Sequence, residues 1–195
     1  MGIHALRPFA LASLFILLVG CEQPKEQGGA DASNTTVQLR GPMRDVPEFH
    51  GVDEQGRPFA ATSMKGRFWL ASFFFTSCES VCPALNTVQA ELQREFGSKI
   101  RFVSITTDPD NDTQERLLAY AERFGARKGT WTFVRMPTDS MRALAVRGFT
   151  VMEPTDPSMH STRFVLVDDQ MRIRDYFDSA DTAEVARLKT VLRGL

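Results

Sequence analysis

The hydrophobic positions of the chain follow strand and helix spacing in alternation. Residues 68–75 form an almost unbroken apolar run, which is typical of a central strand buried on both faces of a sheet. Apolar residues then recur at helical spacing until Gly97 ends the pattern. The alternation continues to the C-terminus, with strands predicted at 100–106, 130–135, 163–167 and 173–177, and helices at 112–125, 139–147 and 181–192. This order predicts an α/β fold, in which helices cover both faces of a central sheet.

Polar residues at the ends of these segments predict turns and helix caps. The turn sequence at 53–56 separates two short extended pieces and predicts an N-terminal hairpin near residues 47–60. Asp112 is followed by Glu115 three residues later, a spacing that is typical of the start of a helix. Asp108 precedes a proline and fits a turn.

The first twenty residues have the features of an export signal. Arg7 precedes an uncharged and mostly apolar run at 8–20. Its apolar part of about a dozen residues is shorter than the ~20 that a membrane-spanning helix needs. The run ends at 18–21 (LVGC), which resembles a bacterial lipoprotein box, in which the cysteine is acylated. We therefore interpret residues 1–20 as a lipoprotein signal peptide and Cys21 as the lipidated residue. A plain signal peptide with an incidental cysteine and an uncleaved anchor are the alternatives.

The composition of residues 21–195 predicts how this part of the chain is divided. Residues 21–45 lack apolar periodicity and are predicted to form a lipidated flexible tether, followed by one domain at 46–195. With 23 basic and 24 acidic residues, the chain lacks the basic excess of a nucleic-acid-binding protein. Acyl chains on Cys21 would hold the domain at the periplasmic side of a bacterial membrane.

Cys78 and Cys82 carry the candidate chemistry, since they are the two thiols left once Cys21 is assigned to lipid. They follow the strand that ends near Phe75, and ligands of α/β sheets collect at such strand ends. Pro83 fits the first helical position and places Cys82 at or next to the N-cap. The pair could be a structural disulfide, a redox pair with a thiolate stabilised by the helix N-terminus, or a site for a soft metal such as copper.

The segment 76–83 (TSCESVCP) resembles the Cys-x-x-x-Cys-Pro motif of the Sco/SenC family, copper proteins of cytochrome c oxidase assembly. A second block at 104–113 (SITTDPDNDT) and a third that begins at His160 and ends at Asp168 extend the resemblance over residues 46–195. The resemblance implies a thioredoxin-like fold with a central mixed sheet. It also implies a membrane-tethered protein that takes part in assembling the CuA centre.

Carried over by position, the resemblance implies that Cys78, Cys82 and His160 bind copper as Cu(I), Cu(II) or both. Asp108 and Asp112 would support this site without touching the metal.

Two positions depart from the family pattern. Family members often have Pro-Asp where this chain has Glu79-Ser80, and many have Asp where it has Met159. Met159 and Met152 are further thioether candidates, although methionine more often fills gaps in a core.

These observations leave several functional hypotheses. The favoured one is a copper metallochaperone that serves the oxidase subunit carrying CuA, or another copper donor or acceptor. The alternative is an enzyme, a thiol–disulfide oxidoreductase in which Cys78 is the attacking thiol and Cys82 its partner. Both need reduced thiols, so a periplasmic thiol reductant is an expected partner. A copper or redox sensor is a third hypothesis.

Overall fold

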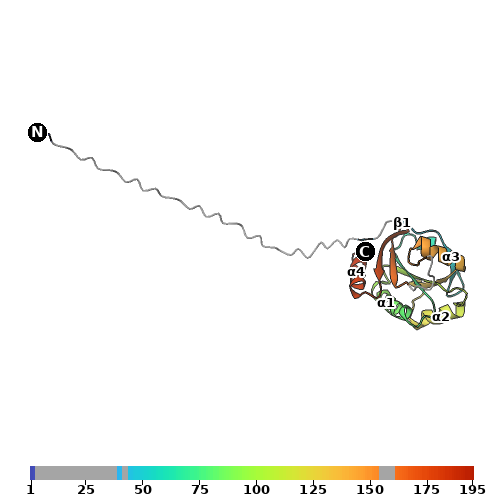
Figure 1. The fold of residues 1–195 in the computed structure, drawn as a ribbon. Helices are drawn as coiled ribbons and strands as arrows, with labels where there is room; N and C mark the ends of the chain where they lie inside the picture. The colour runs from blue at the N-terminus through green and yellow to red at the C-terminus, as the bar shows by residue number, and fades with distance from the viewer. Residues whose placement is uncertain (3–38, 41–43, 154–160) are drawn as a thin grey trace. The chain divides into compact units, whose positions relative to one another are not determined.

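The computed structural model has a mixed sheet flanked by helices (Figure 1). Its strand order is β1-β8-β7-β4-β5-β6-β2-β3. The structure describes residues 1–2, 39–40, 44–153 and 161–195. The chain divides into two units, Met1–Thr35 and Thr36–Leu195, and every element below belongs to the second. No described helix is long and apolar enough to cross a lipid bilayer.

The strands and helices alternate along the chain as the hydrophobic pattern predicts. The strands are β1 (Arg44–Asp45), β2 (His50–Asp53), β3 (Pro58–Ala60), β4 (Trp69–Phe74), β5 (Arg101–Thr106), β6 (Trp131–Arg135), β7 (Arg163–Val167) and β8 (Arg172–Asp178). The helices are the 3-10 helix η1 (Ala61–Met64), α1 (Val81–Phe96), α2 (Gln114–Arg123), α3 (Thr138–Ala143), the π-helix η2 (Leu144–Gly148) and α4 (Thr182–Arg193).

Strand β4 lies in the middle of the sheet and carries the candidate site at its carboxyl end. It pairs in parallel with β5 and antiparallel with β7, and β5 pairs in parallel with β6. The hairpin β2–β3 joins the far edge, where β2 pairs antiparallel with β6. The predicted mixed α/β sheet with an N-terminal hairpin is therefore confirmed.

Two hydrophobic cores lie on opposite faces of the sheet. One contains Leu70 and Phe74 of β4 together with side chains of α1, α2 and α4. The other contains Trp69 and Phe73, the neighbours of those residues along β4, together with side chains of α3, η2 and the N-terminal hairpin. Because both faces of the strand are buried, apolar residues occupy nearly every position, which explains its almost unbroken apolar run.

The outer strands of the sheet are short. Strand β1 pairs with β8 at Arg44 and Asp45 only, and β3 is three residues long. Beyond β1, the side chain of Arg187 donates to the carbonyl oxygen of Tyr176 on β8. Upstream of β1, the backbone N–H of Arg40 donates to Asp175, so the chain contacts the domain before residue 44.

Three local predictions differ from the structure. The helix expected at 139–147 is α only to Ala143, because the N–H of buried Phe149 donates to Leu144 five residues back and forms a π-turn. Asp112 does not cap α2; Thr113 does, by accepting from the N–H of Arg116. Helix α1 begins at Val81, so Pro83 is its third residue and not its first.

Candidate metal centre

Cys78 and Cys82 lie together between the end of β4 and the first turn of α1. The chain leaves the sheet at Phe74, and the N–H of Cys78 donates to the carbonyl oxygen of Phe75 in a turn. Helix α1 then begins at Val81, which places Cys82 one residue inside it. The predicted position at the carboxyl end of a central strand is thus where the structure places the pair.

Both cysteines are free thiols and both are buried. The exposed fraction is 6% for Cys78 and 2% for Cys82. The backbone N–H of Cys82 donates to the Sγ atom of Cys78 over 3.3 Å. The hydroxyl of Ser80 lies 3.8 Å from the same sulfur. The N-terminus of α1 therefore directs its hydrogen bonds at Cys78 and not at the cysteine inside the helix.

These surroundings shift the two thiol pKa values in opposite directions. Burial raises the pKa of Cys78, but hydrogen bonds from Cys82 and Ser80 outweigh it, and the net pKa is lowered. Burial raises the pKa of Cys82 to about 12, with further contributions from its hydrogen bond to Cys78 and from the charges of Cys78 and Asp112. The N-terminus of α1 stabilises a thiolate at Cys78, because the N–H of Cys82 donates to that sulfur.

Asp112 fastens the cysteine loop to the neighbouring strand. Its carboxylate is fully buried and accepts hydrogen bonds from the N–H and hydroxyl of Thr76 and from the hydroxyl of Thr106. Thr76 lies two residues before Cys78, and Thr106 is the last residue of β5. A buried carboxylate with these three donors holds the loop in place, since leaving it unpaired would be costly.

A polar pair lies behind Cys82. The side-chain amide nitrogen of Asn86 donates to the carbonyl oxygen of Cys82 over 2.8 Å and to the hydroxyl of Tyr120 over 3.1 Å. The Tyr120 ring stacks on Phe74 with centroids 5.0 Å apart. Burial raises the pKa of Tyr120, with the charge of Cys82 as the next cause.

The other residues predicted for the site lie in different places. Asp108 forms the expected turn, in which its carboxylate accepts from the side-chain amide of Asn111. Met152 packs in the core on the opposite face of the sheet from the cysteines, so it is not a ligand in this arrangement. Cys21, Met159 and His160 lie outside the described residues. Within the described ranges, no group of three or more His, Cys, Asp or Glu residues could hold a metal ion.

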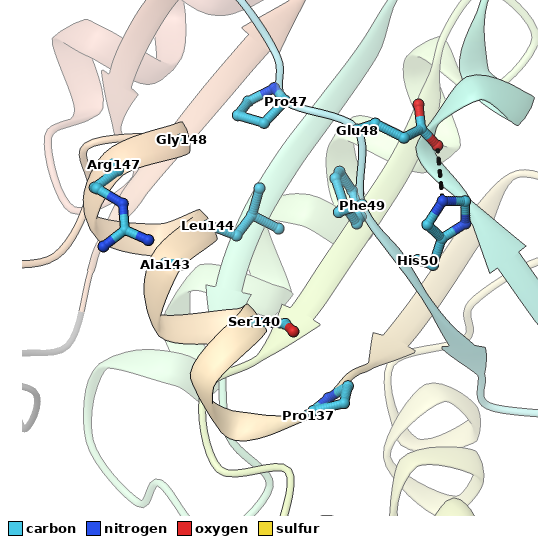
Figure 2. A pocket seen from close by; sticks show the side chains of 10 residues that line it. All are labelled: Pro47, Glu48, Phe49, His50, Pro137, Ser140, Ala143, Leu144, Arg147 and Gly148. Carbon is cyan, nitrogen blue, oxygen red and sulfur yellow. Dashed lines mark ion pairs between the residues drawn. The ribbon is translucent and has the colours of Figure 1, made fainter.

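A groove elsewhere on the domain is not part of this site. It has a volume of about 580 Å³ and lies between residues 47–50 and the helices α3 and η2 (Figure 2). Its lining includes Phe49, Leu144 and His50, whose ring forms an ion pair with Glu48 at 3.6 Å. Neither Cys78 nor Cys82 lines the groove.

The arrangement of the two sulfurs suits two kinds of chemistry. Thiolates are soft donors that favour Cu(I), and an added imidazole allows Cu(II). A pair with one lowered and one raised thiol pKa also suits disulfide exchange, in which the more acidic thiol attacks.

Sequence reasoning missed the residues that position the site. Thr76, Ser80 and Thr106 hold Cys78 or Asp112 by hydrogen bonds, and Asn86 holds the backbone of Cys82. The available signal was polar residues at the carboxyl ends of two adjacent parallel strands, where side chains meet.

The chain is similar to proteins of one known family. The family model SCO1/SenC matches residues 37–192. The SCO1 protein homolog of Bacillus subtilis is 28% identical over 149 residues, which cover 71% of this chain and 77% of that protein. A Stutzerimonas stutzeri protein named "Putative copper-binding protein" is 32% identical over 123 residues, which cover 58% of this chain and 59% of that protein.

Solved structures share the fold. The crystal structure of a SCO1/SenC family lipoprotein from Bacillus anthracis has a TM-score of 0.69 at 25% identity and covers 77% of this chain and 94% of that one. Copper-bound ScoI of Bradyrhizobium japonicum has a TM-score of 0.61 at 22% identity, covers 77% of this chain and 98% of that one, and supports the fold alone. With the family model matching most of its length, this chain belongs to the SCO1/SenC family.

Proposed function

We propose that this protein binds one copper ion through Cys78, Cys82 and His160 and delivers it during assembly of the CuA centre of cytochrome c oxidase. The observation that carries the proposal is the pair of free thiols joined by hydrogen bonds at the carboxyl end of β4. Family membership and the copper-binding name of one relative support it. Copper is the cargo here, taken up from one protein and passed to another.

The chemistry of the donor set fits copper. Two sulfurs supply the soft ligands, and the imidazole of His160 would supply the third. Without a cation the charged form of Cys82 is disfavoured, since its pKa is about 12. Copper would therefore displace the proton of Cys82 as it binds, and uptake would weaken at low pH. A partner's ligands would then replace the three donors one at a time.

Titration of the purified chain with Cu(I) and Cu(II) tests the ligand set. The Cys78→Ser and Cys82→Ser variants should each lose stoichiometric binding, and His160→Ala should lower Cu(II) affinity by about tenfold or more. His50→Ala is the matched control, because His50 is exposed and lies away from the cysteines, at the groove of Figure 2. Undiminished copper binding in His160→Ala would remove the imidazole from the site.

We further propose that the domain is anchored by lipid on Cys21 at the periplasmic side of a bacterial membrane. The lipoprotein box at 18–21 supports this, as does the description of the Bacillus anthracis relative as a lipoprotein. Cells fed labelled palmitate should incorporate it into the wild-type chain and not into Cys21→Ser. Equal labelling of the two would exclude acylation at this residue.

The second candidate function is thiol–disulfide exchange, and the opposite pKa shifts of the two thiols favour it. The Cys78 thiolate would attack a target disulfide and form a mixed disulfide, releasing one target thiolate. Cys82 would then lose its proton and attack Cys78, so that the target leaves as a dithiol and this pair becomes a disulfide. A periplasmic thiol reductant would have to restore the pair after each cycle, and equally before copper loading.

Rapid reduction of a protein disulfide by the copper-free dithiol, together with weak Cu(II) binding, would favour the enzyme. Tight copper binding and a strongly reducing pair would favour the chaperone.

A further inference from the structure

The N-terminus of α1 lacks the side-chain cap that its residue type predicts. Ser80 is the N-cap residue, but its side chain accepts no hydrogen bond from the helix. Its backbone has φ −108° and ψ −93°, whereas the N-cap residues of α2 and α4, Thr113 and Asp181, are extended and accept helix N–H groups. The Ser80 backbone thus holds its hydroxyl away from the position that a capping serine normally takes.

The sulfur of Cys78 takes the place of the missing cap. An N-cap side chain usually accepts from the second or third helical N–H. Here the N–H of Cys82, the second residue of α1, donates to Cys78 Sγ. The Ser80 hydroxyl turns to that same sulfur and lies 3.8 Å from it. The N–H of Cys82 and the hydroxyl of Ser80, two polar groups of one short loop, therefore both contact one sulfur atom.

We propose that Ser80 sets the redox balance of the cysteine pair, because its hydroxyl donates to the Cys78 sulfur and stabilises the reduced form against the disulfide. A reduced sulfur carries partial or full negative charge and accepts hydrogen bonds, whereas a disulfide sulfur is uncharged and a weaker acceptor. Stabilising the reduced form makes a disulfide pair more oxidising. The inference rests on the proposed role of this pair and applies to both candidate functions. Ser80 is also a position at which this chain departs from the residue expected by resemblance.

Equilibration of the copper-free chain with mixtures of reduced and oxidised glutathione at pH 7 tests the proposal. Two glutathione thiols reduce the Cys78–Cys82 disulfide and become one glutathione disulfide, so the ratio of dithiol to disulfide measures the balance directly. Ser80→Ala should shift the equilibrium toward the protein disulfide by about 2- to 12-fold, the range of one hydrogen bond. Ser80→Thr keeps a hydroxyl at the position, so its ratio of dithiol to disulfide should stay close to that of the wild-type chain.

Ser77→Ala is the matched control, because Ser77 is an exposed serine of the same loop and makes no hydrogen bond to the described residues. A Ser80→Ala equilibrium equal to that of Ser77→Ala would overturn the proposal. An equally large shift in Ser80→Thr would also overturn it, because a change in the loop, and not the loss of the hydroxyl, would then explain the shift. Neither readout involves copper, so a failure of copper binding in the ligand variants would leave this result unaffected.

Discussion

The two sulfurs, four residues apart, have different surroundings. Cys78 accepts from the first turn of α1, whereas Cys82 is more deeply buried and close to the charge of Asp112. Hydrogen bonds to a sulfur favour its charged form, while burial and a nearby anion disfavour it. The surroundings of the two sulfurs thus make Cys78 the more easily ionised thiol of the pair.

At the residue scale, Cys78 should react with alkylating reagents before Cys82. Reduced protein treated with iodoacetamide at pH 8 should be modified at Cys78 at least about tenfold faster, because a pKa near 12 leaves very little thiolate at Cys82. Peptide mass spectrometry over time measures both rates. In urea the two rates should converge, since unfolding removes the surroundings that separate them. Faster modification of Cys82 in the folded chain would contradict the assignment.

Asp112→Asn should both loosen the cysteine loop and ease ionisation of Cys82. The amide offers one acceptor oxygen where the carboxylate offers two, so the free energy of unfolding should fall by about 1–3 kcal/mol. Removing the negative charge should also increase the alkylation rate of Cys82. Urea unfolding and alkylation measure the two effects. Asp108→Asn is the control, because among the described residues that side chain accepts from Asn111 alone. Matching behaviour of the two variants would refute the role of Asp112.

At the scale of elements, two hairpins share the same set of contacts around an aspartate in the turn. Asp53 in the β2–β3 turn and Asp168 in the β7–β8 turn each accept backbone N–H groups two and four residues later and pair with the arginine at the fourth. Asp168 is 1% exposed and also pairs with Arg174 at 3.1 Å. Each aspartate fixes the turn and therefore the register of its two strands.

The hydrogen bonds and ion pairs of Asp168 should make the free energy of unfolding fall at acid pH. Burial raises the pKa of Asp168, but hydrogen bonds from Arg172 and Arg174 outweigh it and lower the net value. A lowered folded pKa contributes stability above the unfolded value of about 4, which is lost as the pH falls through the folded value. Asp168→Asn should therefore cost about 1–3 kcal/mol of unfolding free energy at pH 7 and much less at pH 2. A deficit that is the same at both pH values in urea unfolding would contradict this.

Hydrophobic spacing predicted the positions of several elements well. Strand β7 occupies the predicted residues, and α4 begins one residue after the predicted start at 181, because Asp181 is its N-cap. The spacing of hydrophobic residues could not predict the π-turn of η2. The extra residue in that turn depends on how Phe149 packs in the core. The sequence pattern also misassigned Asp112, since a carboxylate near a helix start can either cap the helix or bond to a neighbouring strand.

Only the features of the candidate site that depend on local sequence pattern were predictable. The position of Cys78 and Cys82 after a buried strand follows from local pattern, and the structure confirms it. The choice of Cys78 as the sulfur that accepts the helix N–H does not follow, because it depends on the backbone of Ser80. The ligand role of His160 stays a prediction, as does the lipid on Cys21; both residues lie outside the described residues.

At the scale of the whole molecule, binding of copper at the junction of β4 and α1 should stabilise the domain. A ligand that binds only the folded state, at a free concentration 100 times its dissociation constant, adds about 2.7 kcal/mol to the free energy of unfolding. Thermal unfolding with and without Cu(I) measures the gain, and a copper chelator should reverse it. Cys82→Ser should show no gain; an equal gain in that variant would place the metal elsewhere.

The brevity of β1 and β3 has a consequence for crowding. A long unpaired strand at a sheet margin is a template on which a second molecule can add its own strand and begin to aggregate. Here the outermost strands are only two and three residues long, and the Arg187 guanidinium donates to a carbonyl oxygen of β8 beyond β1. Copies of this protein lying side by side would thus find only short outermost strands to pair with, which disfavours aggregation through β1 or β3.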